Sequence, residues 1–227
     1  SVGVIGDSLA SGEFESRDRE GNILYHDMYE YSWPAVLQRI TGCSYANFSR
    51  GGMAAKEYVE SWADQNGFWK RKQAYIVALG NNDTFVFRHP LGSPDDVFPE
   101  TPKKNADTFF GNMGRILSRL KALEEQAHIF LVTPQRRGEA CDEEIRLIAQ
   151  GLGKLCGMYS RTHLVDMTIY GPVYDEAMRR RFALGFHPNA MGYYAYALMI
   201  GNYIDFLIRK SPEAFSEVPF IGTGLKY

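Results

Sequence analysis

Short runs of apolar residues, each too short to form a helix, recur along this chain of 227 residues. The first run covers Val2 to Ile5 and leads into a Gly-Asp-Ser segment, which is typical of a buried strand that feeds a tight turn. Similar runs follow at Ser44 to Phe48, Ala74 to Leu79, Ile129 to Thr133 and His163 to Asp166. The pattern therefore predicts five short strands.

Longer segments with apolar residues three and four positions apart lie between these runs, and this spacing predicts helices. The predicted helices cover Trp33 to Ile40, Ala54 to Trp62, Phe109 to Leu123, Glu143 to Leu155 and Asn189 to Ile208. Alternating strands and helices are joined by right-handed crossovers, which produce a parallel sheet with helices on both faces. We therefore predict an α/β fold with three layers, α/β/α, around a five-stranded parallel sheet.

Three further segments fit neither pattern. Thr84 to Asn105 is rich in Pro and Asp and follows the third predicted strand, where open α/β sheets place binding loops. Glu13 to Tyr31 is polar, charged and long for a connection, so we expect it to fold over a site. Residues 211–227 are predicted to be a tail that packs on a single domain covering residues 1–227.

Composition narrows the classes of function. A hydrophobic content of 45% is enough for the core of one α/β domain. The net charge of -2, with both signs interspersed along the chain, argues against nucleic acid as a partner. The run Ala195 to Ile200 is far shorter than the ~20 residues that cross a bilayer, so no membrane span is predicted. The oligomeric state is left open.

The spacing and number of the cysteines indicate a cellular compartment for the protein. Cys43, Cys141 and Cys156 form no CxxC motif and leave one thiol unpaired in any disulfide scheme, which favours a reducing compartment such as the cytoplasm. However, Ser1 lies directly before an apolar strand and is not an initiator Met. Removal of an N-terminal signal, and therefore secretion, is the alternative.

Four short motifs at the ends of predicted elements carry groups suited to acyl transfer. Gly6-Asp7-Ser8 ends the first strand and presents Ser8 as a candidate nucleophile. After the second strand, Gly52 allows a backbone N–H to approach a ligand closely. Asn82 follows the third strand with a side-chain amide, and His187 lies just before the last long predicted helix. Judged singly, these motifs also fit ordinary turns and a structural histidine.

In this order, the four motifs resemble the sequence blocks of the SGNH (GDSL-type) hydrolase superfamily, which has a flavodoxin-like fold. The resemblance extends from Gly6 to Gly192. It implies a serine esterase with Ser8 as nucleophile and His187 as base, and an oxyanion hole formed by the N–H groups of Ser8 and Gly52 with the Asn82 amide. The chemistry requires such a set, because a hydroxyl needs an imidazole to take its proton and the tetrahedral intermediate needs donors.

One position departs from the pattern of that superfamily. An Asp usually lies three residues before the histidine, and here the position is Leu184. We expect a backbone carbonyl of residues 183–185 to accept from His187 Nδ1 instead, which gives a Ser-His dyad. An acid from elsewhere is one alternative, and its candidates are Asp166, Asp175 and Glu176. A carbohydrate-binding relative without catalytic activity is another.

Phe85, Phe87 and Phe186 are the aromatic residues that we expect to contact the substrate. Resemblance to SGNH enzymes that act on acetylated polysaccharides implies hydrolysis of small acyl esters, above all acetyl esters on carbohydrate, through an acyl-enzyme intermediate. A lipase or thioesterase acting on longer acyl chains is the alternative. The sequence has no HExxH motif or Cys/His cluster, so we expect neither a metal nor another cofactor.

Overall fold

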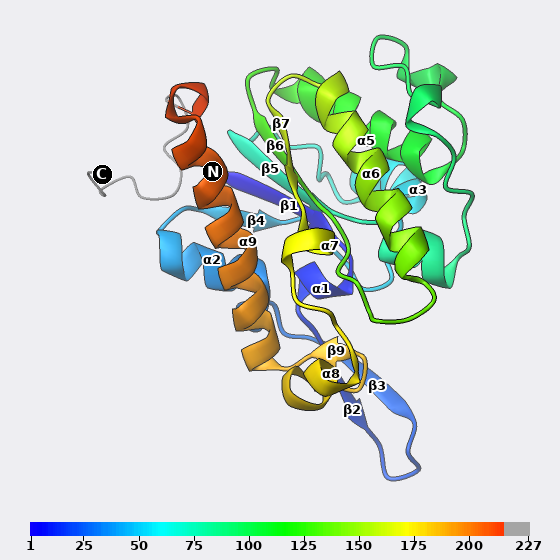
Figure 1. The fold of residues 1–227 in the computed structure, drawn as a ribbon, viewed down its shortest axis with the longest axis vertical. Coiled ribbons are helices and arrows are strands. Elements are labelled where there is room, and N and C mark those ends of the chain that lie inside the picture. The colour runs from blue at the N-terminus through cyan, green and yellow to red at the C-terminus, as the bar shows by residue number, and fades with distance from the viewer. Residues whose placement is uncertain (216–227) are drawn as a thin grey trace.

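Five parallel strands form the centre of the computed structural model, which describes residues 1–215. They are β1 (Val2–Gly6), β4 (Tyr45–Asn47), β5 (Ala74–Ala78), β6 (His128–Val132) and β7 (Thr162–Val165). Their order across the sheet is β4-β1-β5-β6-β7, and every neighbouring pair is parallel (Figure 1). The predicted five-stranded α/β fold is confirmed.

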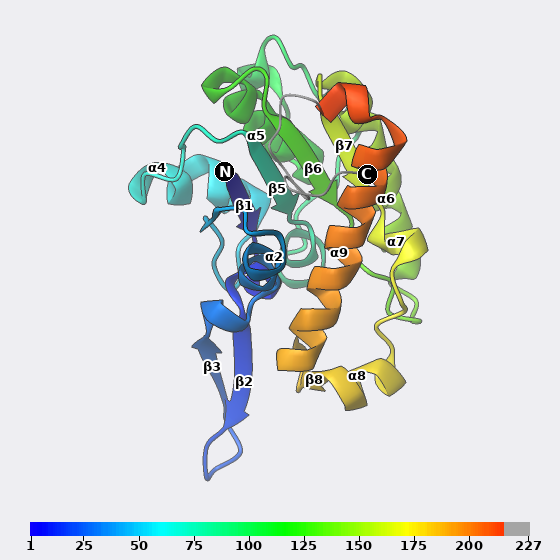
Figure 2. The same ribbon diagram turned by 90° about the vertical axis from the view of Figure 1, so that its left-hand side faces the viewer.

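Helices cover both faces of this sheet, as Figures 1 and 2 show. One face carries α2 (Trp33–Thr41) and α9 (Ala190–Lys210), and the other carries α3 (Ala55–Glu57), α5 (Phe109–Leu123) and α6 (Asp142–Met158). Polar side chains cap three of the predicted helices at their N-termini, because Ser32, Thr108 and Asn189 accept hydrogen bonds from first-turn amides.

The alternating side chains of the strands divide the hydrophobic core into two clusters. In β1, Val2 and Val4 pack with α2 and α9, whereas Ile5 packs with α5 and α6. All five residues of β1 are buried, as are the five of β6. Strands buried on both faces appear in the sequence as continuous apolar runs, which explains why these runs could be recognised.

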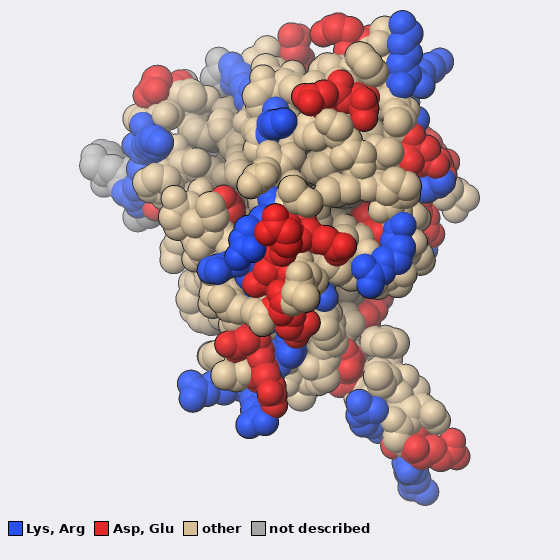
Figure 3. Space-filling view, turned by 45° about the vertical axis from the view of Figure 1, so that its right-hand side comes forward, with Lys and Arg blue, Asp and Glu red and all other residues tan. Residues whose placement is uncertain are grey.

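Two hairpins lie outside the sheet, and the sequence pattern did not predict them as strands. The first pairs β2 (Glu13–Arg17) with β3 (Ile23–Asp27), and the second pairs β8 (Ala183–Leu184) with β9 (His187–Pro188). The β2–β3 hairpin projects from the body of the protein, with charges of both signs at its tip (Figure 3). Every residue of β3 is exposed, so β3 shows no alternation of buried and exposed positions.

The remaining elements are short turns of helix. The predicted helix from Ala54 to Trp62 is instead three segments, since α3 continues into a π-helical turn η2 (Tyr58–Trp62) and then α4 (Ala63–Gln65). The others connect longer elements: α1 (Ser8–Ser11), η1 (Tyr29–Tyr31), η3 (Asn82–Val86), η4 (Pro94–Asp96), η5 (Pro102–Lys104), α7 (Met167–Tyr170) and α8 (Glu176–Phe182).

The predicted tail is described only in part. After α9, η6 (Pro212–Phe215) turns back and buries Phe215 against the α9 side of the sheet, and residues 216–227 lie outside the described part. Within residues 1–215, no helix has the length and apolar character needed to cross a membrane.

Candidate active site

Ser8 lies at the point where β1 ends and α1 begins. Asp7 caps α1, because its Oδ1 accepts a hydrogen bond of 3.0 Å from Leu9 N. Burial raises the pKa of Asp7 to about 6. The helix ends after one turn at Gly12, whose φ of 83° is left-handed and whose Cβ position lies 2.8 Å from Met28 O. Only glycine fits there, and the chain passes directly into β2.

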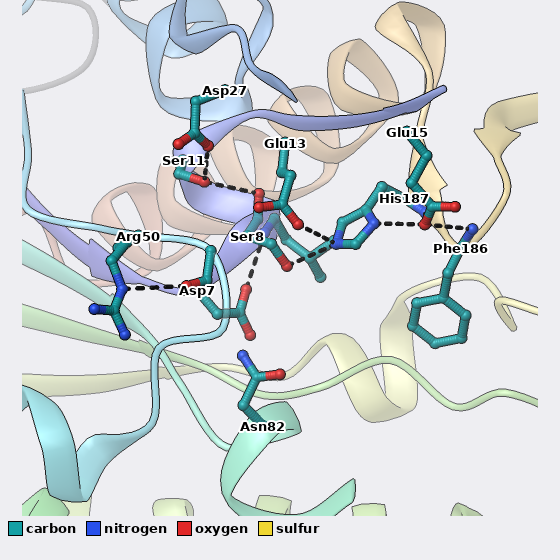
Figure 4. Close-up of polar contacts among 12 residues, drawn as sticks. Asp7, Ser8, Ser11, Glu13, Glu15, Asp27, Arg50, Asn82, Phe186 and His187 are labelled. Carbon is teal, nitrogen blue, oxygen red and sulfur yellow. Dashed lines mark hydrogen bonds and ion pairs between the residues drawn. The ribbon is translucent and has the colours of Figure 1, made fainter. Parts of the chain in front are cut away.

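His187 faces Ser8 from the far end of the sequence. It lies on β9, and its Nε2 is 2.9 Å from Ser8 Oγ (Figure 4). The side chain is mostly buried, with 12% of it exposed, and Tyr25 of β3 packs edge-on against its ring. The structure thus brings together, within hydrogen-bond distance, the two residues that sequence analysis selected as nucleophile and base.

Glu15 holds the other nitrogen of the same ring. Its Oε1 lies 2.7 Å from His187 Nδ1 and also accepts the backbone N–H groups of Phe186 at 2.8 Å and His187 at 3.1 Å (Figure 4). The expected partner, a backbone carbonyl of residues 183–185, is therefore wrong. A carboxylate takes that place, and it comes from the β2–β3 hairpin.

The β8–β9 turn is shaped to admit this carboxylate. Gly185, at its centre, has a φ of 68°, and a Cβ there would lie 1.8 Å from Glu15 Oε2. Leu184, at the position where an Asp was expected, is 45% exposed. The space beside the imidazole that a side chain at Gly185 would take is occupied by Glu15.

The three acids considered from the sequence lie in other contacts. Asp166 caps α7 by accepting from Ile169 N, and Asp175 caps α8 by accepting from Met178 N. Glu176 forms an ion pair with Arg180. Sequence analysis missed Glu15, although one signal was present: Glu13 and Glu15 alternate directly after the Ser8 turn, and residues two apart on a strand share a face.

Glu13 contacts the opposite side of the imidazole. Its Oε1 is 3.2 Å from His187 Nε2, the nitrogen that also faces Ser8. Burial raises the pKa of Glu13, while the nearby His187 acts in the opposite direction. A protonated Glu13 can donate to a neutral Nε2, whereas an ionised Glu13 can only accept from an imidazolium. Glu13 and Glu15 therefore flank the ring on both sides.

Two loops at the same edge of the sheet present the predicted oxyanion donors. Gly52 has a φ of 72°, and its Cβ position faces open space. Asn82 Nδ2 donates to Met53 O at 3.1 Å, and the buried carboxylate of Asp83 accepts from Ala55 N at 3.0 and 3.1 Å. These bonds tie the loop after β4 to the loop after β5, and Gly52 and Asn82 line the same cavity as Ser8.

A cavity of about 590 Å³ opens over these groups. Phe85 and Phe186 line it, as expected, and Tyr174 positions Phe186 by donating to its carbonyl at 3.1 Å. Phe87 does not line the cavity: it follows the π-helical turn η3, is 48% exposed and stacks on His89. Its expected contact with substrate is therefore not supported.

The described chain offers no cluster of metal ligands. Among residues 1–215, no group of three or more His, Cys, Asp or Glu side chains is placed to hold a metal ion.

Solved structures with this fold include esterases. A carbohydrate esterase of family 2 from Clostridium thermocellum, in complex with cellohexaose, has 12% identity and a TM-score of 0.60 over 94% of this chain and 64% of that one. A carbohydrate esterase of family 3 from Talaromyces cellulolyticus has 14% identity and a TM-score of 0.57, covering 92% and 98% of the two chains. A possible lipase from Chitinophaga pinensis has 17% identity and a TM-score of 0.60, covering 92% and 97%.

No curated protein matches the sequence. The model of the GDSL-like lipase/acylhydrolase family, however, matches residues 4–195, which include Ser8, the two donor loops and His187. The chain therefore belongs to the GDSL-like lipase/acylhydrolase family and is an ester-hydrolysing enzyme.

Proposed function

We propose that the protein is a serine esterase with a Ser8–His187–Glu15 triad, which removes small acyl groups, above all acetyl, from carbohydrate. The observation that carries the proposal is the continuous chain of contacts at 2.9 Å from Ser8 Oγ to Nε2 and 2.7 Å from Nδ1 to Glu15. This is the order of contacts that a triad requires. Here the acid comes from a hairpin that directly follows the nucleophile turn.

In the first half-reaction, Ser8 Oγ bonds to the carbonyl carbon of the ester while its proton passes to His187 Nε2. Glu15 accepts from Nδ1–H, which fixes the tautomer with a free Nε2 and stabilises the imidazolium. The carbonyl oxygen becomes an oxyanion, and the N–H groups of Ser8 and Gly52 with the Asn82 amide stabilise it. The alcohol then leaves with the proton from His187, and an acyl-enzyme remains.

In the second half-reaction, a water molecule attacks the acyl carbon. His187 takes the proton from that water, the acyl–Oγ bond breaks, and the proton returns to Ser8 as the acid is released. Support for carbohydrate as the alcohol comes from the aromatic rings of Phe85 and Phe186 in the cavity wall and from the carbohydrate esterases with this fold.

Hydrolysis of p-nitrophenyl acetate and p-nitrophenyl octanoate by the wild type and by Ser8→Ala tests this proposal. We expect a preference for acetate, labelling of Ser8 by a serine-directed phosphonate, and a loss in kcat of about 10⁶-fold in Ser8→Ala. Full activity in Ser8→Ala would refute the mechanism. A preference for octanoate would instead favour a lipase or thioesterase.

A further inference from the structure

Arg137 is a cationic residue in the cavity wall that the mechanism above does not use. It lies in the loop between β6 and α6 and lines the same cavity as Ser8 and His187. Among the residues that line this cavity, Asp7, Glu13 and Glu15 are acidic, and Arg137 is the only Lys or Arg. Arginine is a permanent cation in proteins.

The backbone of Arg137 is fixed by the start of α6. Asp142 accepts from Arg137 N at 2.6 Å and from Gly138 N at 3.1 Å. Asp142 is thus bound to backbone amides, and Glu139 of the same loop forms an ion pair with Arg179, so neither carboxylate pairs with the guanidinium. Two short bonds to one carboxylate also restrict how far the loop can move.

Two aromatic rings hold the guanidinium itself. Its central carbon lies 4.3 Å from the centroid of Phe85 and 5.1 Å from that of Phe186. Such contacts orient a planar guanidinium but leave its N–H groups, which lie in its plane, free to donate. One N–H donates to Asn81 Oδ1 at 3.4 Å, and within residues 1–215 no carboxylate lies within 4.0 Å of the group.

We propose that Arg137 binds a carboxylate on the alcohol part of the substrate, so that the preferred substrate is an acetylated acidic sugar of the uronic acid type. A carboxylate matches the planar fork of Arg with two parallel hydrogen bonds. The acidic residues of the cavity leave this position open, because Glu13 and Glu15 lie against His187 and Asp7 caps α1. This inference rests on the proposed esterase function.

The test is the ratio of kcat/KM for an acetylated methyl glucuronide to kcat/KM for the matching acetylated methyl glucoside. We expect the wild type to prefer the charged substrate by about 10- to 100-fold. Arg137→Gln should bring the ratio to one or below, and Arg137→Lys should keep only part of it, because Lys lacks the planar fork. Any general loss of activity cancels in the ratio.

Arg136→Gln is the matched control, because Arg136 donates to Thr168 O at 2.9 Å and lines a different cavity. It should keep the wild-type ratio. A wild-type ratio near one, or a preference that survives in Arg137→Gln, would overturn the inference. Preference for an acetylated sugar phosphate over the glucuronide would overturn the assignment to a carboxylate. These outcomes are separate from failure of the esterase function, which Ser8→Ala reports.

Discussion

Ser8, Gly52 and Asn82 follow the carboxyl ends of three strands of the central sheet, whereas Glu15 and His187 lie on two short hairpins outside the sheet. The backbone that leads into Ser8 is fixed by core packing, because every residue of β1 is buried. The acid contacts the base through hydrogen bonds of Glu15 Oε1 with three N–H groups of Phe186 and His187. The position of Ser8 thus depends on core packing, whereas the contact between acid and base depends on a few hydrogen bonds.

The comparison predicts that changes in the hairpins reduce activity with little loss of global stability. Glu15→Gln has the largest expected effect, a decrease in kcat of about 10³- to 10⁴-fold, because an amide cannot stabilise the imidazolium and favours the wrong tautomer. Steady-state kinetics together with thermal unfolding measures both quantities.

Glu20→Gln is the control for this change, since Glu20 is an exposed residue on the same hairpin and should retain activity. A second variant sharpens the result. In Glu15→Ala, adding Leu184→Asp should restore part of kcat, because Leu184 pairs with His187 across the β8–β9 hairpin. Wild-type activity in Glu15→Gln would exclude Glu15 from the triad.

On the sheet edge, Asn82→Ala is expected to lower kcat by about 10²- to 10³-fold with a smaller change in KM, since one donor to the oxyanion is lost. The change also removes the hydrogen bond to Met53 O. Asn66→Ala controls for that structural cost, because Asn66 Nδ2 donates to the carbonyl of Trp62 at 2.9 Å away from the cavity. Equal kcat in both variants would contradict a role in the oxyanion hole.

Gly185→Ala should have an intermediate effect, a decrease in kcat of about 10-fold or more. A Cβ at this position lies 1.8 Å from Glu15 Oε2, so the carboxylate must move away from the imidazole ring. Misplacement of a catalytic group by about 1 Å is enough to lower kcat by such a factor. Gly21→Ala is the matched control, because Gly21 also has a positive φ, of 88°, but no atom lies within 4 Å of its Cβ position. Both variants carry backbone strain, and only Gly185→Ala should lose activity.

The smallest effect is expected for the stability of Glu13→Gln. Burial raises the pKa of Glu13 in the folded protein. The contribution of Glu13 to the free energy of unfolding is therefore greatest below its unfolded pKa, near 4.5. This contribution is lost as pH rises through the folded pKa. At pH 8 the variant should therefore melt about 2 °C higher than the wild type. The difference should disappear toward pH 4.5, as thermal unfolding across this range would show. A gain that does not change with pH would contradict burial of the charge as its cause.

Elements with a regular pattern of apolar residues could be predicted from the sequence. Phe109–Leu123 was predicted with its observed bounds, because its apolar stripe follows the helical period. Ser8 and His187 could be selected because each lies at the junction of a predicted element and a loop.

The triad acid could not be predicted in this way. Its contact joins residues 171 and 172 positions apart, and it depends on the pairing of β2 with β3, a strand whose residues are all exposed. The expectation that Phe87 contacts the substrate is not supported for a related reason. The π-helical turn η3 lies directly before Phe87 and changes which side chains point into the cavity. A π-helical turn rotates the side chains that follow it, and the amino-acid composition of the segment does not reveal this.

The β2–β3 hairpin is anchored to the body of the protein at its base. Met28 N donates to Gly12 O, Ser11 Oγ donates to Asp27, and the buried Tyr193 hydroxyl donates to Glu13 O. Local opening of such a unit requires less free energy than global unfolding. On heating or in mild denaturant, the fraction of catalytically competent molecules should therefore fall before the central sheet unfolds. Loss of activity and global unfolding should then be separate transitions.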